Sequence, residues 1–541
     1  RSELLLNYME KKSMDLNNIK RNHLDYILTD MLPTELSERF TFFYFYEFLM
    51  TKRKELKQMN NFLISVKNKY KTGVMFEGGG SGHGGHKGNN WVTMPLKYSI
   101  MKELHTEREI SLLQPIAAVE LFAFVSIYQK ELINLLDMNS IFSLRHHHKN
   151  NELCYKNKNK SITKYFAVES AQIDKDLIEK TGMFFDIKPY KSIASFTSSE
   201  EWLVLNSKYR YFIRTDYKAC FDSIYTHTFK WLIGKDVNDT KDFKNTNIYT
   251  TIDRILQNIN ARTSNGIVVG PEFSRMIAEI LLQAIDRTVY SKLLNSGKAV
   301  GENYNVYRFV DDIFIFAESE ELANEIVQIY SEISAKYLLR LNEGKLYKNT
   351  VPFVLDEWIN ETSIFANRTS TCLFRTKEEQ EIWLQKEKQN SPEKEVVPHI
   401  LKSRALYYSK RSIMNQLNEL ICEYPSKDRT IVAYFLGTIL NKVSRNKENV
   451  KIFSEHVTEQ TVANFMDLIF YAYSFFPNYN NTQRFLSIVS YIRDEYDIFT
   501  SSEQLQKLVN KYAFIFDKAN LNDIINLVLF CAHAKIEIPY R

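Results

Sequence analysis

Apolar and polar positions follow a helical spacing towards both ends of the chain and a mixed pattern between them. Between residues 15 and 75, apolar residues recur every three or four positions, which predicts packing helices. From 91 to 350, short β-branched and aromatic runs alternate with helical patterns and predict a mixed α+β region. From 399 to 541 the spacing is helical throughout, which predicts an all-α region.

Two irregular segments separate these parts. Residues 78–88 (GGGSGHGGHKG) hold seven of the 16 glycines and lack the residue order of a P-loop, so we expect a flexible linker rather than a phosphate cradle. Residues 385–397 are charged and contain a proline, as in an exposed connection. We therefore expect N-terminal helices and the Gly-rich loop at 1–90, a mixed domain at 91–350, a connection at 351–398, and a helical-repeat-like domain at 399–541.

Composition narrows the class of protein. Apolar residues make up 44% and charged residues 25%, as in an ordinary globular protein. The formal net charge of +5 is too small to indicate a nucleic-acid partner by itself. Five scattered cysteines with no CxxC pair argue against a disulfide framework and favour a reducing cytoplasm. No run approaches the roughly 18 apolar residues of a membrane span, so we expect no membrane association.

Histidines occur in two clusters whose meaning is open. His83 and His86 fall in the Gly-rich loop, and His146, His147 and His148 are consecutive. Imidazoles can bind metal ions, but no partner carboxylate lies at a diagnostic spacing from either cluster. The sequence alone therefore assigns no metal site to them.

Three aspartates stand where strands are expected to end or turn. The β-prone run 211–216 ends in Asp216, and Asp311-Asp312 lie between two hydrophobic runs, as at the tip of a hairpin. Taken singly, a helix cap would explain Asp216 and an exposed turn would explain Asp311-Asp312. Nucleotide polymerisation, however, needs carboxylates that converge on two divalent ions. Their combination in this order favours a polymerase site.

Four segments follow one another around these acids: FIRTDYKACFDS, NGIVVGPEFSRMIAEILL, YRFVDDIFIFA and LNEGKL. In this order they resemble motifs A to D of the reverse-transcriptase family. The resemblance implies a fingers-palm domain over about 91–350. It also implies that Asp216 and Asp311 are the principal metal ligands, with Asp312 beside them, and that the ion is Mg²⁺ or, alternatively, Mn²⁺.

The same resemblance suggests further roles near the acids. Phe221, five residues after Asp216, matches an aromatic gate that crowds a ribose 2′-hydroxyl, and a core phenylalanine is the alternative. Lys345 matches a lysine that protonates or screens the departing pyrophosphate, and a solvated surface lysine is the alternative.

Four residues are expected to line the nucleotide pocket. Gly270 would allow close backbone approach before a helix that begins near Ser274. Arg108, and after it Lys97, would hold the triphosphate from the fingers. Val268 stands where family members usually have proline, which leaves the fine geometry of the pocket open.

The amino-acid sequences of the motifs are most similar to those of bacterial abortive-infection and defence-associated reverse transcriptases. That likeness implies a cytoplasmic bacterial enzyme that uses dNTPs, makes DNA in anti-phage defence and forms homo-oligomers. Some members of this group extend DNA from their own tyrosine without a template, and others copy a partner non-coding RNA. Two alternatives are a non-catalytic RNA-binding protein with a degenerate palm and a ribonucleotide polymerase.

Overall fold

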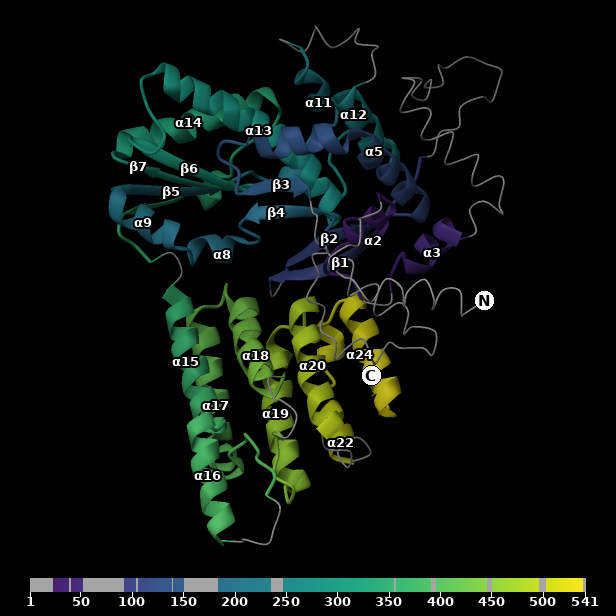
Figure 1. Cartoon of the computed structure of the whole chain (residues 1–541), viewed down its shortest axis with the longest axis vertical. Helices are drawn as coiled ribbons and strands as arrows, with labels where there is room; N and C mark the ends of the chain where they lie inside the picture. Colours follow the sequence, from purple (N-terminus) through teal and green to yellow (C-terminus); the bar gives the residue numbers. More distant parts are fainter. Residues whose placement is uncertain are drawn as a thin grey trace.

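The computed structural model describes residues 23–37, 40–51, 92–103, 106–138, 140–149, 183–234, 247–354, 357–390, 396–444, 450–495 and 503–538. The expected Gly-rich loop, with His83 and His86, lies outside these residues, as does much of the expected N-terminal helical segment. The described residues form a mixed region followed by a helical one (Figure 1). The predicted order of an α+β part and an all-α part is therefore confirmed.

The mixed region is built on a four-stranded antiparallel sheet with the strand order β6-β7-β5-β8. Two separate two-stranded ladders, β1-β2 and β3-β4, complete its strands. Its elements are η2 (His23–Asp25), α2 (Tyr26–Thr29), α3 (Phe43–Thr51), β1 (Leu96–Glu103), β2 (Thr106–Leu112), α5 (Pro115–Ile133), the π-helical turn η3 (Asn134–Met138), β3 (Arg145–Lys149), β4 (Phe185–Pro189), α8 (Ile193–Thr197), α9 (Glu200–Lys208), β5 (Tyr211–Asp216), α10 (Cys220–Ser223), α11 (Thr228–Trp231), α12 (Ile248–Asn258), α13 (Glu272–Asn295), β6 (Tyr304–Phe309), β7 (Asp312–Ala317), α14 (Glu320–Lys336), η4 (Glu343–Lys345) and β8 (Tyr347–Thr350).

Both faces of the four-stranded sheet are covered, which explains why the central strands β5 and β7 bury residues of both faces. Helices α13 and α14 lie over one face, and α8 and α9 lie over the other (Figure 1). On the second face the Trp202 ring lies edge-on to Phe212, Phe314 and Phe316, with centroid distances of 5.7, 6.1 and 5.2 Å. This aromatic layer fixes β5 and β7 side by side.

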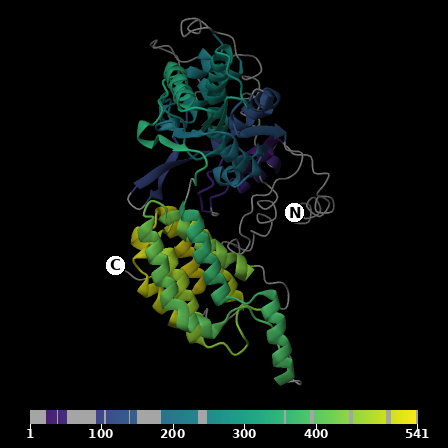
Figure 2. The ribbon, with the colours of Figure 1, turned by 90° about the vertical axis from the view of Figure 1, so that its left-hand side faces the viewer.

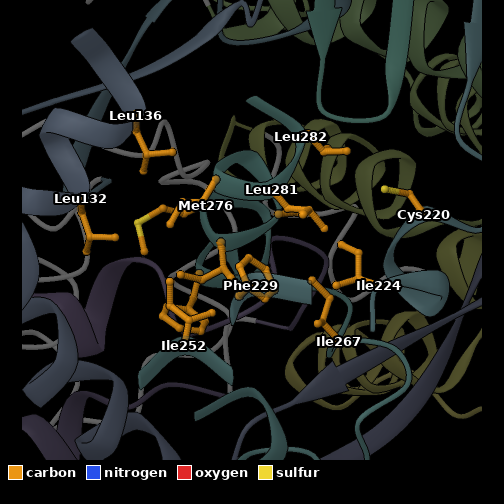
Figure 3. Packing of buried hydrophobic residues seen from close by; sticks show 14 of the residues in the cluster. Leu132, Leu136, Cys220, Ile224, Phe229, Ile252, Ile267, Met276, Leu281 and Leu282 are labelled. Carbon is orange, nitrogen blue, oxygen red and sulfur yellow. The ribbon is translucent and has the colours of Figure 1, made fainter. Parts of the chain in front are cut away.

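The largest core lies between α5, α12, α13 and the segment that follows β5. Figure 3 shows Leu132 and Leu136 facing Met276 of α13, with Phe229 and Ile224 on the other side of that helix. Helix α13 is buried over most of its surface, and its buried residues include the charged Glu279 and Asp286 among apolar side chains. The core therefore holds the segments on both sides of β5 against one long helix.

The helical region has its own core and consists of helices packed side by side. Contacts join α15 to α17 and α18, α17 to α19, α18 to α20, α19 to α22, and α20 to α24. Helix α15 thus belongs to this core, although it lies in the segment expected to be a connection. The elements are α15 (Glu357–Leu373), α16 (Lys377–Asn390), α17 (Ser403–Glu423), α18 (Asp428–Ser444), α19 (Glu459–Phe475), α20 (Tyr479–Glu495), α22 (Glu503–Lys511), α23 (Ile515–Lys518) and α24 (Leu521–Ala534).

Two further features concern exposed and apolar helices. Helix α16 has no buried residue and extends away from the other helices of the region (Figure 2). Single side chains link it to the rest of the region, such as Trp383, whose ring lies edge-on to that of His399 with centroids 4.6 Å apart. Across the described part of the chain, no helix combines the length and the apolar character that crossing a bilayer requires.

Candidate active site

The three aspartates named above reach one end of the four-stranded sheet. Asp216 is the last residue of β5, Asp312 is the first residue of β7, and the two are register partners. Phe309 pairs with Asp312, so Val310 and Asp311 form a two-residue turn between β6 and β7. Because register partners project from the same face, the carboxylates of Asp216 and Asp312 leave the same side of the sheet.

The Asp216 side chain is nearly buried, and only one of its two carboxylate oxygens has a hydrogen-bond partner among the described residues. Its Oδ2 accepts a hydrogen bond from Lys345 Nζ at 2.7 Å, whereas its Oδ1 is buried and has no hydrogen-bond partner among the described residues. The backbone N–H of Asn342 donates to the Asp216 carbonyl at 2.8 Å, which ties the turn that carries Lys345 to the end of β5. A buried carboxylate oxygen without a donor is costly, and a cation is one way to satisfy it.

Asp311 carries the clearest electrostatic signature of the site. Burial raises its pKa to about 6, and the neighbouring negative charges of Asp312 and Asp216 act in the same direction. The Arg108 guanidinium opposes this shift in the pKa of Asp311. Negative charge is thus concentrated here, and a bound cation would relieve it.

Asp312 is held by a residue that the sequence reading missed. Arg214 donates from Nη2 and Nε to Asp312 Oδ1, at 2.9 and 3.2 Å, and its guanidinium lies 5.4 Å from the centre of the Phe314 ring. Asp312 is therefore directed towards Arg214, and the ligand atoms of the three acids do not all lie within 4.8 Å of one another. The signal for Arg214 was its position two residues before Asp216, on the same face of β5.

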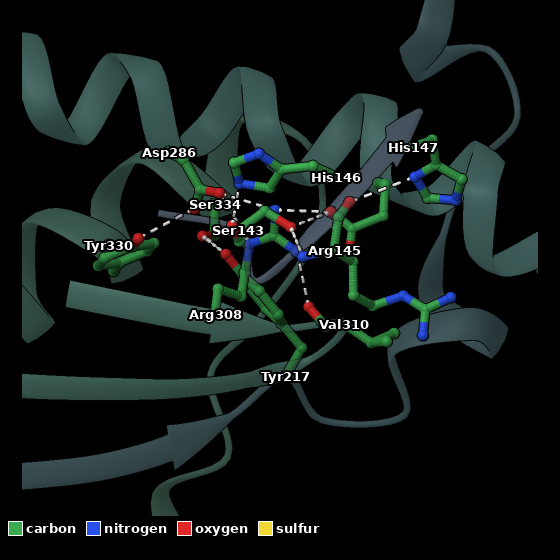
Figure 4. A network of polar contacts seen from close by, with 11 residues as sticks. Ser143, Arg145, His146, His147, Tyr217, Asp286, Arg308, Val310, Tyr330 and Ser334 are labelled. Atoms are coloured by element: carbon green, nitrogen blue, oxygen red, sulfur yellow. Dashed lines mark hydrogen bonds and ion pairs between the residues drawn. The ribbon is translucent and has the colours of Figure 1, made fainter. Parts of the chain in front are cut away.

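The turn that carries Asp311 has an unusual backbone and a buried anchor (Figure 4). Val310 has φ of +57°, a region that β-branched residues rarely adopt. Its carbonyl accepts a hydrogen bond from Arg308 Nη1 at 2.9 Å. Arg308 is fully buried and donates to both oxygens of Glu279, at 3.1 and 3.0 Å, and to Asp286 Oδ2 at 2.8 Å.

This buried network joins the turn that carries Asp311 to α13. Glu279 and Asp286 are seven residues apart, two helical turns, and so share one face of α13. Tyr330 of α14 donates to Asp286 Oδ1 at 2.9 Å. The sequence offered one sign, an arginine in the middle of an apolar strand, but its partners on a distant helix could not be identified from spacing.

Phe221 lies in α10, directly after the strand end. Its ring is partly buried against the main core, and its carbonyl accepts a hydrogen bond from Ile267 N–H at 2.9 Å. The adjacent Cys220 is close enough to the acids for Asp311 and Asp216 to contribute to the raised pKa of its thiol, a shift caused mainly by burial. Phe221 therefore stands beside the acids, and its role as a sugar gate stays a prediction.

Of the residues expected in the nucleotide pocket, Lys97 and Arg108 lie in the β1-β2 ladder, Gly270 packs against that ladder, and Ser274 lies in α13. Gly270 has φ of +127°, and a Cβ there would meet Ile110 Cγ2 at 2.8 Å and Pro33 Cγ at 2.9 Å, so internal packing already requires glycine. Ser274 is fully buried in α13. Lys97 forms an exposed ion pair with Glu109 at 2.6 Å. Of the two basic residues, Arg108 is the one whose charge acts on Asp311.

The donor set fits divalent metal ions. Hard oxygen ligands are supplied by Asp216 and Asp311, with Asp312 adjacent, and the unpartnered Oδ1 of Asp216 is available for coordination. Lys345 supplies a positive charge at the same carboxylate, and its hydrogen bond to Asp216 raises its own pKa. Such an arrangement can bind metal-associated phosphates.

A family model matches the part of the chain that contains the three aspartates. Residues 150–364 match the family model described as "Reverse transcriptase (RNA-dependent DNA polymerase)", so the chain contains a reverse-transcriptase domain, and this range includes Asp216, Asp311, Asp312 and Lys345. A search of curated proteins gives no match.

Solved structures similar to the chain include telomerases. One is from Candida albicans, in complex with a TWJ fragment of telomeric RNA, with a TM-score of 0.29, 11% identity, and coverage of 86% of this chain and 66% of that one. Another is apo telomerase from Candida tropicalis, with a TM-score of 0.29, 12% identity, and coverage of 88% of this chain and 73% of that one. The chain thus spans about two thirds of the length of the first of these telomerases.

Proposed function

We propose that this protein is a DNA polymerase of the reverse-transcriptase type that uses dNTPs and acts in bacterial anti-phage defence. One observation supports the polymerase activity: Asp216, Asp311 and Asp312 lie at the same end of the sheet, inside the matched reverse-transcriptase domain. The defence role rests only on the similarity of the motif sequences to those of defence-associated reverse transcriptases. The product is proposed to be primed by a tyrosine without a template or copied from a partner non-coding RNA, in a homo-oligomer.

The residues would divide the chemistry between them. Asp216 and Asp311, with Asp312 beside them, would hold Mg²⁺ or Mn²⁺. Such ions lower the pKa of a primer hydroxyl and stabilise the leaving pyrophosphate when bound. Lys345 and Arg108 would supply positive charge around the triphosphate, and Phe221 would exclude a 2′-hydroxyl.

The central experiment measures incorporation of labelled dNTPs with Mg²⁺ by the wild-type chain and by Asp311→Asn and Asp216→Asn variants. Each substitution keeps the shape of the side chain and removes a charged ligand, so we expect loss of incorporation. Asp222→Asn is the matched control, because Asp222 is an exposed acid in α10 close in sequence to Asp216. Equal incorporation by all four proteins would refute the polymerase proposal.

The products of the same reactions test the finer statements. Label that stays with denatured protein after nuclease trimming indicates a tyrosine primer. Sequencing of the product distinguishes a copied template from a homopolymer or random addition. Parallel rNTP reactions test the ribonucleotide alternative, and tight RNA binding without any incorporation would favour a non-catalytic RNA-binding protein.

A further inference from the structure

A second cluster of possible metal ligands lies away from the three aspartates. Asp137, His146 and His148 offer ligand atoms that all lie within 4.8 Å of one another. His148 Nδ1 is 3.1 Å from Asp137 Oδ2, and His146 Nδ1 is 3.8 Å from Asp137 Oδ1. All three side chains are partly exposed, so an ion from solvent can reach them.

The local fold places these ligands on one side of β3. His146 and His148 are two residues apart in a strand and therefore project from the same face, with ring centroids 6.3 Å apart. Asp137 comes from the π-helical turn Asn134–Met138 that ends α5 and contacts β3. Short π-helical turns are rare and occur often at functional sites.

One ring is already oriented for coordination. His146 Nε2 lies 2.8 Å from the backbone carbonyl of Ser143. A carbonyl can only accept, so Nε2 carries the hydrogen and donates, which leaves the Nδ1 lone pair on the side of Asp137. Histidines that bind metals commonly donate their other ring N–H to such a carbonyl, which fixes the tautomer and the ring orientation.

We propose that Asp137, His146 and His148 form a binding site for a first-row transition-metal ion of the Zn²⁺ type. For tetrahedral Zn²⁺ with ligand bonds of about 2.0–2.1 Å, neighbouring ligand atoms are about 3.3 Å apart. The separations of His148 Nδ1 from Asp137 Oδ2, 3.1 Å, and of His146 Nδ1 from Asp137 Oδ1, 3.8 Å, lie on either side of that value. Three protein ligands leave one position for water.

The ligand chemistry separates this site from the three aspartates. Two imidazoles and one carboxylate favour Zn²⁺, Co²⁺ or Ni²⁺, whereas a site built from carboxylates alone suits Mg²⁺. In β4, Asp186 stands opposite His148, but its carboxylate is paired with Lys188 at 2.7 Å. Asp186 therefore already has an ion-pair partner, and we do not count it among the three proposed metal ligands.

The position of the site gives it a structural consequence. Arg145, also in β3, pairs with Glu272 of α13, and its guanidinium lies 5.3 Å from the centre of the Phe309 ring. Phe309 directly precedes the turn of Val310 and Asp311. An ion bound by Asp137 and the two histidines would thus tie the end of α5 to the strand that supports the catalytic hairpin.

The experiment is a titration of the chelator-treated full chain with Co²⁺ in excess Mg²⁺, followed by visible absorption and calorimetry. The starting protein carries His83→Ala and His86→Ala, which removes the other histidine cluster of the sequence. We expect one equivalent of Co²⁺ with intense d–d bands, displaced by Zn²⁺. His148→Ala and Asp137→Asn should each weaken binding by at least the roughly 10–100-fold that loss of a supporting partner causes.

Two controls keep the result interpretable. His456→Ala removes an exposed histidine elsewhere and should bind Co²⁺ like the starting protein. Asp311→Asn should also leave Co²⁺ binding unchanged, so failure of the polymerase proposal would not affect this one. Circular dichroism without metal checks that each variant is folded. Absence of stoichiometric binding by the starting protein, or equal binding by folded His148→Ala and Asp137→Asn, would overturn the proposal.

Discussion

Replacement of Arg308 by lysine tests whether the buried network positions the catalytic turn. Lysine keeps the positive charge but lacks the planar fork with which Arg308 reaches Glu279, Asp286 and the Val310 carbonyl together. The ammonium group should remain with the two carboxylates and leave the Val310 carbonyl without its donor. Losing two hydrogen bonds that involve charged groups, at about 1.5–3 kcal/mol each, should lower the free energy of unfolding by about 3–6 kcal/mol.

The turn should then be less well fixed, with a larger effect on turnover than on binding. A displacement of about 1 Å in a catalytic group can reduce the rate on the order of 100-fold. We therefore expect the kcat of dNTP incorporation on a supplied primer and template to fall on that scale in Arg308→Lys, while the KM for dNTP changes much less. The assay is run at a temperature where thermal unfolding curves show the variant to be folded.

Tyr330→Phe is the matched control for this prediction. It removes the hydrogen bond from the Tyr330 hydroxyl to Asp286 at the far end of the same network and leaves the bond to Val310 in place. It should lower stability by about 1.5–3 kcal/mol without a comparable loss of kcat. If both variants lose kcat in proportion to their stability, or if Arg308→Lys keeps its full kcat, the network does not position the turn.

Three further predictions follow from single contacts. Phe221→Ala should lower the preference for dNTP over rNTP, measured as the ratio of the two kcat/KM values, and Phe221→Tyr should keep this preference. An unchanged ratio in Phe221→Ala would show that the ring is not the gate. Lys345→Met should reduce kcat and lower the free energy of unfolding by about 1–3 kcal/mol, because it leaves Oδ2 of the nearly buried Asp216 without its donor. Burial raises the pKa of Asp523 to about 7, against an ordinary value of 3.8, so the native helical region keeps a proton that the unfolded chain loses between these values. Its free energy of unfolding should therefore fall as pH rises from about 4 to 7, by up to about 4 kcal/mol, and Asp523→Asn should flatten that dependence in urea unfolding at pH 5 and pH 8.

The features that sequence reading predicted are those encoded by local pattern. The helical spacing after residue 399 and the hairpin with Asp311 at its tip depend on residues close in sequence, and the structure contains both. The Arg308 network was not predicted, because its partners lie 22 and 29 residues away and meet it only after α13 packs on the sheet. Asp137 was missed for a similar reason, since the π-helical turn, rather than sequence spacing, brings it to the histidines.

Gly270 shows that the packing of distant segments can also require a residue that a motif assigns to a site. The resemblance assigned it to the nucleotide pocket, but the space of its missing Cβ is filled by Ile110 and Pro33. Four residues after Pro33, the backbone and hydroxyl of Ser37 donate to Asn522 at 2.6 Å and to Asn526 at 2.7 Å, both in α24. The last helix of the chain is thus joined, through one short N-terminal segment, to the loop that precedes α13.

These contacts are buried, and they would be exchanged for hydrogen bonds to water if α24 separated from that segment. Each protein hydrogen bond contributes a net of about 0.5–1.5 kcal/mol relative to water, so these two contacts together oppose the separation. The helical region therefore does more than follow the polymerase-like region along the chain. It holds the segment against which the loop before α13 packs, and α13 in turn carries the carboxylates that bind Arg308 beneath the catalytic turn.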